Sequence, residues 1–466
     1  MSECQGAGRL RPLALGLALT SVVVGCAHAA GEASAGSPAT APAAAAPAAS
    51  GQAPTAREGT ESASEVVEAA LAVVSAAREL TATGKVRGVS ESRATMAQQV
   101  KVTIEKEVPP EVMTAEADLL TLLGAAPTNF DYAASIIDLM SSQLAGYYDP
   151  ATKTMYLASD LGKAEREATL AHELVHALQD QHYHLENLTQ YRPDQSDAQS
   201  AVHALAEGDA TSAMFDQMLA PRGMKATDLS EQLIGVQVRA AASFSGGMGN
   251  VPDILKRSLV SPYVDGIEFV HFLRRRGGWA AVDAAWTSPP SSTEQLLHPE
   301  KFVAHELPLA VGVPVSPEGM GEPVYTDVMG EQSIRLLLEE WMPRAPAIAS
   351  ASGWGGDRVA VWRSGDRVAL AWHVVGDDVS AATRTHAALL RGVDGQRDPS
   401  AKGTAGPCSE RSDRGPLFVE RRGRDIVVIA GPFVRQGGKG RSDSSCAEAK
   451  KWAERVFNSK VAKKSP

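Results

Sequence analysis

Apolar residues recur at every third or fourth position through much of the chain between residues 61 and 276. This period is typical of amphipathic helices, because a helix turns once every 3.6 residues. It predicts helices over 61–81, 95–107, 110–123, 131–144, 162–184, 197–219 and 263–276. Between the fourth and fifth of these helices, the residues over 154–158 alternate in polarity, which predicts a β-strand.

A different pattern begins after Trp341. Alternating polarity predicts strands over 358–363, 367–375, 416–421 and 425–430. A helical period predicts helices over 379–390 and 445–457. This order is typical of a small α+β domain. We therefore expect an α+β protein with two units. A mostly helical domain with an edge strand covers residues 62–345, and a small α+β domain covers 346–460.

The first 61 residues do not fit either pattern. Arg9 and Arg11 precede an apolar run over 13–24 that is too short to span a bilayer permanently, as in a signal peptide. Residues 26–61 are rich in Ala, Pro, Gly and Ser and predict a flexible tether.

The apolar run ends in Val-Val-Gly-Cys, which resembles a bacterial lipobox. That resemblance implies that residues 1–25 are a lipoprotein signal peptide and that Cys26 carries lipid as the new N-terminus. Ordinary secretion, with Cys26 lost or idle, is the alternative. The expected location is the bacterial cell envelope, anchored to a membrane through Cys26 and facing the periplasm or the exterior.

Charge and cysteine content narrow the range of functions. The net charge is -10, and no concentrated basic stripe in the sequence offsets this acidic balance. We therefore expect no nucleic-acid partner. Cys4 lies in the signal peptide and Cys26 in the anchor, which leaves Cys408 and Cys446. Two remaining thiols in an exported protein predict one disulfide in the C-terminal part.

The candidate chemistry lies in the fifth predicted helix, which contains His172-Glu173-Leu174-Val175-His176. Residues four apart project from the same side of a helix, so His172 and His176 can bind one Zn²⁺ together. Glu173, beside them, is placed to accept a proton from a water molecule on the metal.

A catalytic zinc usually has three protein ligands, and three residues compete for the third position. His182 has the spacing of His-Glu-x-x-His-x-x-Gly-x-x-His, but Gln179 stands where that motif needs glycine. Glu207 lies among Ala, Leu and Met on the next strong helix, where a buried carboxylate needs a partner. We therefore predict Glu207 as the third ligand, with His203, one turn earlier, as the remaining rival.

The sequence HELVH followed by AEGDA resembles the gluzincin group of zinc metallopeptidases. The longer strings GYYDPATKTMYL, LAHELVHALQDQH, PPSSTEQLLHPEKF and GWGGDRVAVW resemble a poorly characterised family of bacterial secreted metallopeptidases. The resemblance implies a zincin-like fold. It also implies that the strand over 154–158 is an edge strand that pairs with the substrate. Many gluzincins carry an aspartate four residues after the glutamate, to orient a zinc-binding histidine. Here Thr211 occupies that position, so Asp209 or another residue must take that role.

These observations predict a zinc-dependent metallopeptidase that acts on a peptide or protein substrate, with Glu173 as general base. Tyr263 and His298 are the candidate donors to the oxyanion. The alternative is a catalytically idle zincin-like lipoprotein that acts as a binding or assembly module. An intact Glu173 argues against it, because a scaffold needs no base beside the metal.

Overall fold

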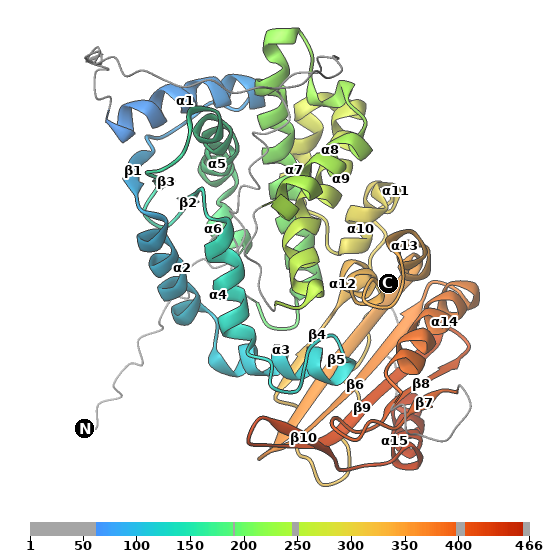
Figure 1. Ribbon diagram of the computed structural model, residues 1–466. Helices are drawn as coiled ribbons and strands as arrows, with labels where there is room; N and C mark the ends of the chain where they lie inside the picture. Colours follow the sequence, from blue (N-terminus) through green and yellow to red (C-terminus); the bar gives the residue numbers. More distant parts are fainter. Residues whose placement is uncertain (1–61, 190–191, 245–250, 398–405, 460–466) are drawn as a thin grey trace, which may run out of the picture.

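The computed structural model describes residues 62–189, 192–244, 251–397 and 406–459. It is a mixed α and β protein in which a helical unit is followed by a C-terminal sheet domain (Figure 1). The expected signal peptide, the lipidated Cys26 and the tether over 26–61 lie outside the described residues. Within the described ranges, no helix is both long enough and apolar enough to cross a membrane.

The helical unit contains most of the helices that the periodicity predicts. The helix expected over 263–276 instead runs from Asp253 to Thr287, with non-helical backbone angles at Gly277 and Gly278. The other predicted ends agree to within three residues with those of the helical unit, and the helix over 110–123 agrees at both ends. Its helices are α1 (Ala63–Arg78), α2 (Arg93–Glu107), α3 (Pro110–Leu123), α4 (Tyr132–Gln143), α5 (Lys163–Tyr183), α6 (Leu185–Thr189), α7 (Ser196–Leu219), α8 (Glu231–Phe244), α9 (Asp253–Thr287), α10 (Thr293–Leu297) and α11 (Pro299–Val303).

A small three-stranded sheet lies beside α5. Its strands are β1 (Arg87–Glu91), β2 (Gly146–Asp149) and β3 (Thr154–Ala158), in the order β1-β3-β2. The prediction that 154–158 is an edge strand is wrong, because β3 pairs with β1 on one side and with β2 on the other. Residues 146–149 form β2, which among the described strands pairs with β3 alone.

Helices α7 and α9 pack at unusually close range. A Cβ atom added to Gly208 of α7 would lie 2.2 Å from the backbone of Gly266 in α9. One added to Gly266 would lie 1.9 Å from the carbonyl oxygen of Ala204. The residue that is a weakness by helix propensity alone is therefore the one that allows the two backbones to touch.

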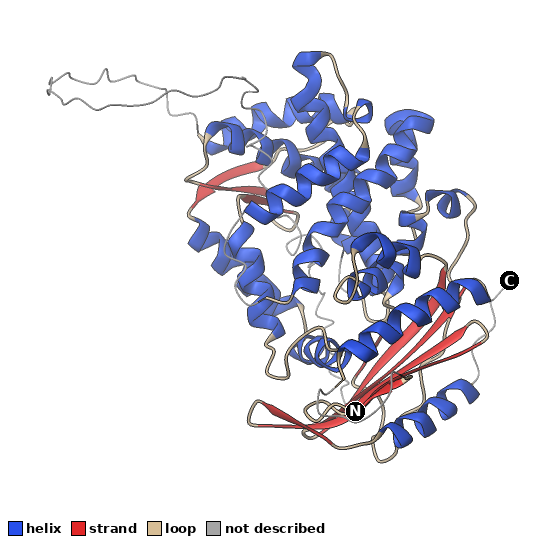
Figure 2. Ribbon diagram, turned by 45° about the vertical axis from the view of Figure 1, so that its right-hand side comes forward, coloured by secondary structure: helices blue, strands red, loops and turns tan. Residues whose placement is uncertain are grey.

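The larger sheet has the strand order β4-β5-β6-β9-β8-β7, and β10 also pairs with β9. Its strands are β4 (Tyr325–Asp327), β5 (Trp354–Ser364), β6 (Arg367–Gly376), β7 (Cys408–Ser409), β8 (Leu417–Arg422), β9 (Asp425–Gln436) and β10 (Lys439–Ser442). The C-terminal helices are α12 (Gly330–Leu338), α13 (Arg344–Ala351), α14 (Val379–Gly395) and α15 (Cys446–Asn458). Figure 2 shows helices on both faces of this sheet.

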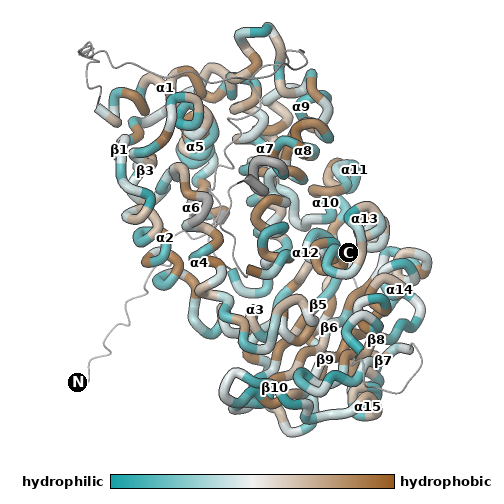
Figure 3. Tube along the Cα trace, viewed as in Figure 1, coloured by the Kyte–Doolittle hydropathy of each residue, from teal (hydrophilic) through white to brown (hydrophobic). Residues whose placement is uncertain are grey.

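The two faces of the larger sheet have separate apolar cores. Val361, Leu370 and Val428 face a core shared with α3, α12 and α14, whereas Trp362 and Ile429 face α15. Figure 3 shows the apolar positions along these strands. The predicted disulfide between Cys408 and Cys446 is present and joins β7 to α15.

The sheet also includes residues that precede the predicted boundary at 346. Strand β4 pairs with β5, and α3 of the helical unit contributes Leu119 and Leu122 to the core beneath the sheet. Part of the helical unit therefore packs in the same core as one face of the sheet.

Candidate metal centre

His172 and His176 of α5 and Glu207 of α7 converge on one point. The two Nε2 atoms of the histidines are 3.3 Å apart. Oε2 of Glu207 lies 3.0 Å from Nε2 of His172 and 3.7 Å from Nε2 of His176. Among the described residues, this is the group of at least three His, Cys, Asp or Glu side chains that could hold a metal ion.

The triad lies in the interior because both helices that carry it are buried on almost every side. In α5 every residue from Ala168 to Asp180 is buried, and in α7 the same holds from Ala204 to Asp216. Leu174 and Leu178 of α5 pack in one core with Leu205 and Ala206 of α7. Apolar packing thus surrounds the turns that carry the three side chains.

The three donor atoms suit a tetrahedral metal ion. Two ligands about 2.0–2.1 Å from such an ion lie roughly 3.3 Å apart. The separations of 3.3, 3.0 and 3.7 Å in the triad lie on either side of that value. Two imidazole nitrogens and one carboxylate oxygen also match the ligand types of hydrolytic zinc sites.

Neighbouring side chains orient two of the three ligands. Nδ1 of His176 lies 2.9 Å from Oε1 of Gln179, on the same helix. Nε2 of His203 lies 3.2 Å from Oε1 of Glu207, the oxygen that does not face the two histidines. His203, the rival third ligand, thus contacts the carboxylate from outside the triad. In the sequence, Gln179 stands where the extended zinc motif needs glycine, and this was its only predicted significance. Its spacing of three from His176 nevertheless places both residues on one side of a helix.

Burial and mutual charge shift the pKa values of the triad. Burial lowers the pKa of His172 and outweighs its hydrogen bond to Glu207. Burial also acts to lower the pKa of His176, but the Glu207 carboxylate prevails and raises it to about 9. Burial acts to raise the pKa of Glu207, yet the charge of His176 and the hydrogen bonds with His172 and His203 hold it well below its usual range. Glu207 is therefore an anion at neutral pH, as a metal ligand must be.

Glu173 follows His172 on α5 and is fully buried. Its Oε2 accepts a hydrogen bond from the backbone N–H of Tyr148, at 3.1 Å. Tyr148 belongs to β2, so the strand that ends the small sheet contacts the predicted base directly. Tyr147, the residue before it, stacks on Tyr156 of β3 at 4.9 Å between ring centroids.

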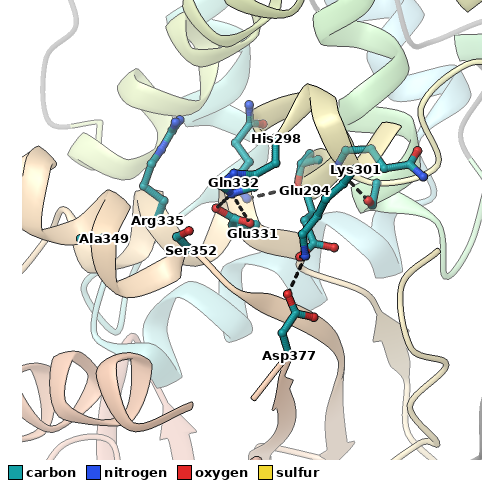
Figure 4. Close-up of polar contacts among 12 residues, drawn as sticks. Glu294, His298, Lys301, Glu331, Gln332, Arg335, Ala349, Ser352 and Asp377 are labelled. Carbon is teal, nitrogen blue, oxygen red and sulfur yellow. Dashed lines mark hydrogen bonds and ion pairs between the residues drawn. The ribbon is translucent and has the colours of Figure 1, made fainter. Parts of the chain in front are cut away.

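The two predicted oxyanion donors lie in different surroundings. The ring of Tyr263 in α9 is buried and stacks on His172, with 5.7 Å between ring centroids. His298 follows α10, and its Nε2 lies 2.9 Å from Oε1 of Glu331 in α12 (Figure 4). That hydrogen bond raises the pKa of His298. Tyr263 thus adjoins the triad, whereas the hydrogen bond between His298 and Glu331 places His298 in a polar cluster with α12.

Two further residues from the sequence interpretation have partners outside the triad. Nε2 of His182 lies 2.7 Å from the carbonyl oxygen of Thr81, so it bonds to the loop after α1. The Asp209 carboxylate accepts hydrogen bonds from Arg78 and from Nε1 of Trp286. The proposed role of Asp209 in orienting a histidine is not seen, because its side chain points to α1 and α9.

A family model described as "Domain of unknown function (DUF8575)" matches residues 318–439. The matched segment contains most of the larger sheet and none of the triad residues. No curated protein and no solved structure matches the chain.

Proposed function

We propose that this protein is a zinc-dependent metallopeptidase with a zincin-like catalytic domain. The observation that supports it best is the buried His172, His176 and Glu207 triad, whose donor atoms have the spacing of tetrahedral ligands. A bound zinc ion would supply an activated water and polarise the scissile carbonyl.

Glu173 would act as the general base. It would accept the proton of the attacking water and return it to the leaving amine. The backbone N–H of Tyr148 holds one of its oxygens in place, so the carboxylate enters the reaction already oriented. Tyr263, stacked on His172, is the better placed of the two predicted oxyanion donors.

The substrate would be a peptide or protein in extended form. Strand β2 has β3 as its one partner strand in the described sheet, and it contacts Glu173 through Tyr148. A peptide that adds to the other edge of β2 would run beside the base, and backbone pairing would tolerate varied side chains. We therefore assign the pairing with substrate to β2 instead of β3, because β3 already has two partner strands.

The N-terminal sequence supports a location at the bacterial cell envelope, with lipid on Cys26. The disulfide between Cys408 and Cys446 agrees with an oxidising compartment.

The function is tested by zinc analysis and casein hydrolysis with the full chain and with Glu173→Gln. The variant is expected to keep one zinc per chain and to lose at least about 10²-fold in turnover, because only the proton acceptor changes. Glu165→Gln, in the first turn of the same helix, is the matched control and should keep full activity.

Two other results would argue against the peptidase. If the wild-type protein binds no zinc, the proposed metal centre is wrong. Zinc binding without hydrolysis of casein, a peptide panel or esters would favour the binding or assembly module instead.

A further inference from the structure

Gln179 connects the two helices that carry the triad. It is fully buried one turn after His176 on α5. Its Oε1 lies 2.9 Å from Nδ1 of His176, and its Nε2 donates to the backbone carbonyl of Ala206 at 3.1 Å. Ala206 immediately precedes Glu207 on α7, so one amide side chain reaches both a histidine and the turn that carries the carboxylate.

The contact with Ala206 determines which way the amide faces. A backbone carbonyl can only accept a hydrogen bond, so the NH₂ group of Gln179 must be the end that faces it. The amide oxygen therefore faces His176, and Nδ1 of His176 must carry a hydrogen to donate to it. In the neutral form that can bind a metal ion, this hydrogen on Nδ1 leaves the lone pair of the ring on Nε2. That is the atom that faces His172 and Glu207.

We propose that Gln179 is a positioning residue of the metal centre, which selects the His176 tautomer with a free Nε2 lone pair and fixes the distance between α5 and α7. This inference rests on the proposed function and specifies how its site is held. In many gluzincins an aspartate orients a zinc-binding histidine, but here Thr211 stands at its position and Asp209 points away. Gln179 takes over that orienting role.

The choice of an amide has a chemical consequence. A carboxylate at this position would add a negative charge next to the imidazole and raise its basicity. Gln179 orients the ring without adding charge, so Glu207 would be the one ligand with a formal charge once a metal ion replaces the proton on Nε2 of His176. A metal ion held this way would keep more of its positive charge for polarising a substrate carbonyl.

Gln179→Met and Gln179→Glu separate positioning from packing. Methionine fills a similar volume but can neither accept from His176 nor donate to Ala206. Glutamate keeps an oxygen toward His176. Gln181→Met is the control, because Gln181 lies on the same helix and bonds to the backbone of Thr83 and Gly84, away from the triad.

The full chain of each variant is titrated with zinc against a chelator of known affinity, and the visible spectrum of the Co²⁺ form is recorded. We expect Gln179→Met to weaken zinc binding by about 10–100-fold, the usual effect of removing a partner of a metal-binding histidine. Its Co²⁺ bands should also shift. Gln179→Glu should stay within several-fold of the wild type, and Gln181→Met should match it.

The inference is overturned if Gln179→Met binds zinc as tightly as the wild type with an unchanged Co²⁺ spectrum. It is also overturned if Gln179→Glu loses as much affinity as Gln179→Met, since an oxygen that accepts from His176 would then not preserve the site. Both results leave the proposed peptidase standing. A wild-type protein that binds no zinc would instead reject the proposed function itself.

Discussion

Arg78 of α1 and Asp209 of α7 form an ion pair in which neither side chain is exposed, with 2.5 Å between Nε and Oδ1. The guanidinium also stacks on Trp279, with its central carbon 4.3 Å from the ring centroid. Asp209 lies two residues after Glu207, so α1 contacts the back of the helix that carries the third candidate ligand. This favours the region before α5 as an integral part of the helical unit and not as a removable pro-segment.

Arg78→Met should lower the free energy of unfolding by about 3–5 kcal/mol, because the Asp209 charge would stay buried without its cation. Urea denaturation measures the change. Adding Asp209→Asn to this variant should recover part of the loss. Lys85→Met, which removes an exposed pair with Glu68 at 3.9 Å, should change stability little. Equal effects of Arg78→Met and Lys85→Met would contradict this account.

Asp197 in the first turn of α7 should make stability fall as the pH rises. Burial, helped by Asp357 and Glu294 and opposed by hydrogen bonds from Thr293, raises its pKa to about 7. An unfolded aspartate has a pKa near 3.9, so between about pH 4 and 7 the folded state binds more protons than the unfolded state. The contribution of Asp197 to stability is therefore complete at low pH and is lost as the pH rises through 7.

Asp197→Asn should remove this dependence, because an amide does not titrate. Both hydrogen bonds from Thr293 go to Oδ1, and the oxygen of asparagine can accept them. The stability of the variant relative to the wild type should increase by roughly 1.4 kcal/mol per pH unit between about pH 4.5 and 6.5. Parallel stability curves for the two proteins between pH 4.5 and 8 would refute the prediction.

Gly208→Ala should be destabilising although alanine is the better helix former. The added methyl group would lie 2.2 Å from the backbone of Gly266, so α7 and α9 would have to separate. A loss of about 2 kcal/mol or more is expected, the upper part of the range for overpacked sites. Gly235→Ala in α8 is the control. Its nearest neighbours would be the flexible end of Arg239 at 3.2 Å and a methyl group of Val264 at 3.3 Å, which need shift by only a few tenths of an ångström, so this variant should be near neutral.

Reduction of the disulfide between Cys408 and Cys446 should destabilise the sheet domain while zinc binding continues. The bridge closes 38 residues, for which the loop-entropy relation gives about 4 kcal/mol. Thermal unfolding of Cys408→Ser/Cys446→Ser against the wild type measures the loss. If the zinc affinity falls together with the stability, the metal centre depends on the sheet domain and the prediction is wrong.

Local sequence determined the helices and the first two candidate ligands. The spacing of His172 and His176 places both rings on one side of α5 whatever surrounds the helix, because helix geometry depends only on neighbouring residues. Apolar periodicity likewise located α3, α5 and α7 to within a residue or two of their ends. The pair Cys408 and Cys446 was predicted from the cysteine count once Cys4 and Cys26 had been assigned to the signal peptide and the anchor.

Only the tertiary structure decided which distant residues meet. β3 is central because β1, more than 60 residues earlier, pairs beside it, and nothing within 154–158 encodes that partner. Glu207 lies at the histidines, and His203 behind it, because of the angle at which α7 packs on α5. The orientation of Gln179 depends on a carbonyl of α7. Such contacts arise from packing between segments far apart in the chain, and local patterns of polarity carry no record of them.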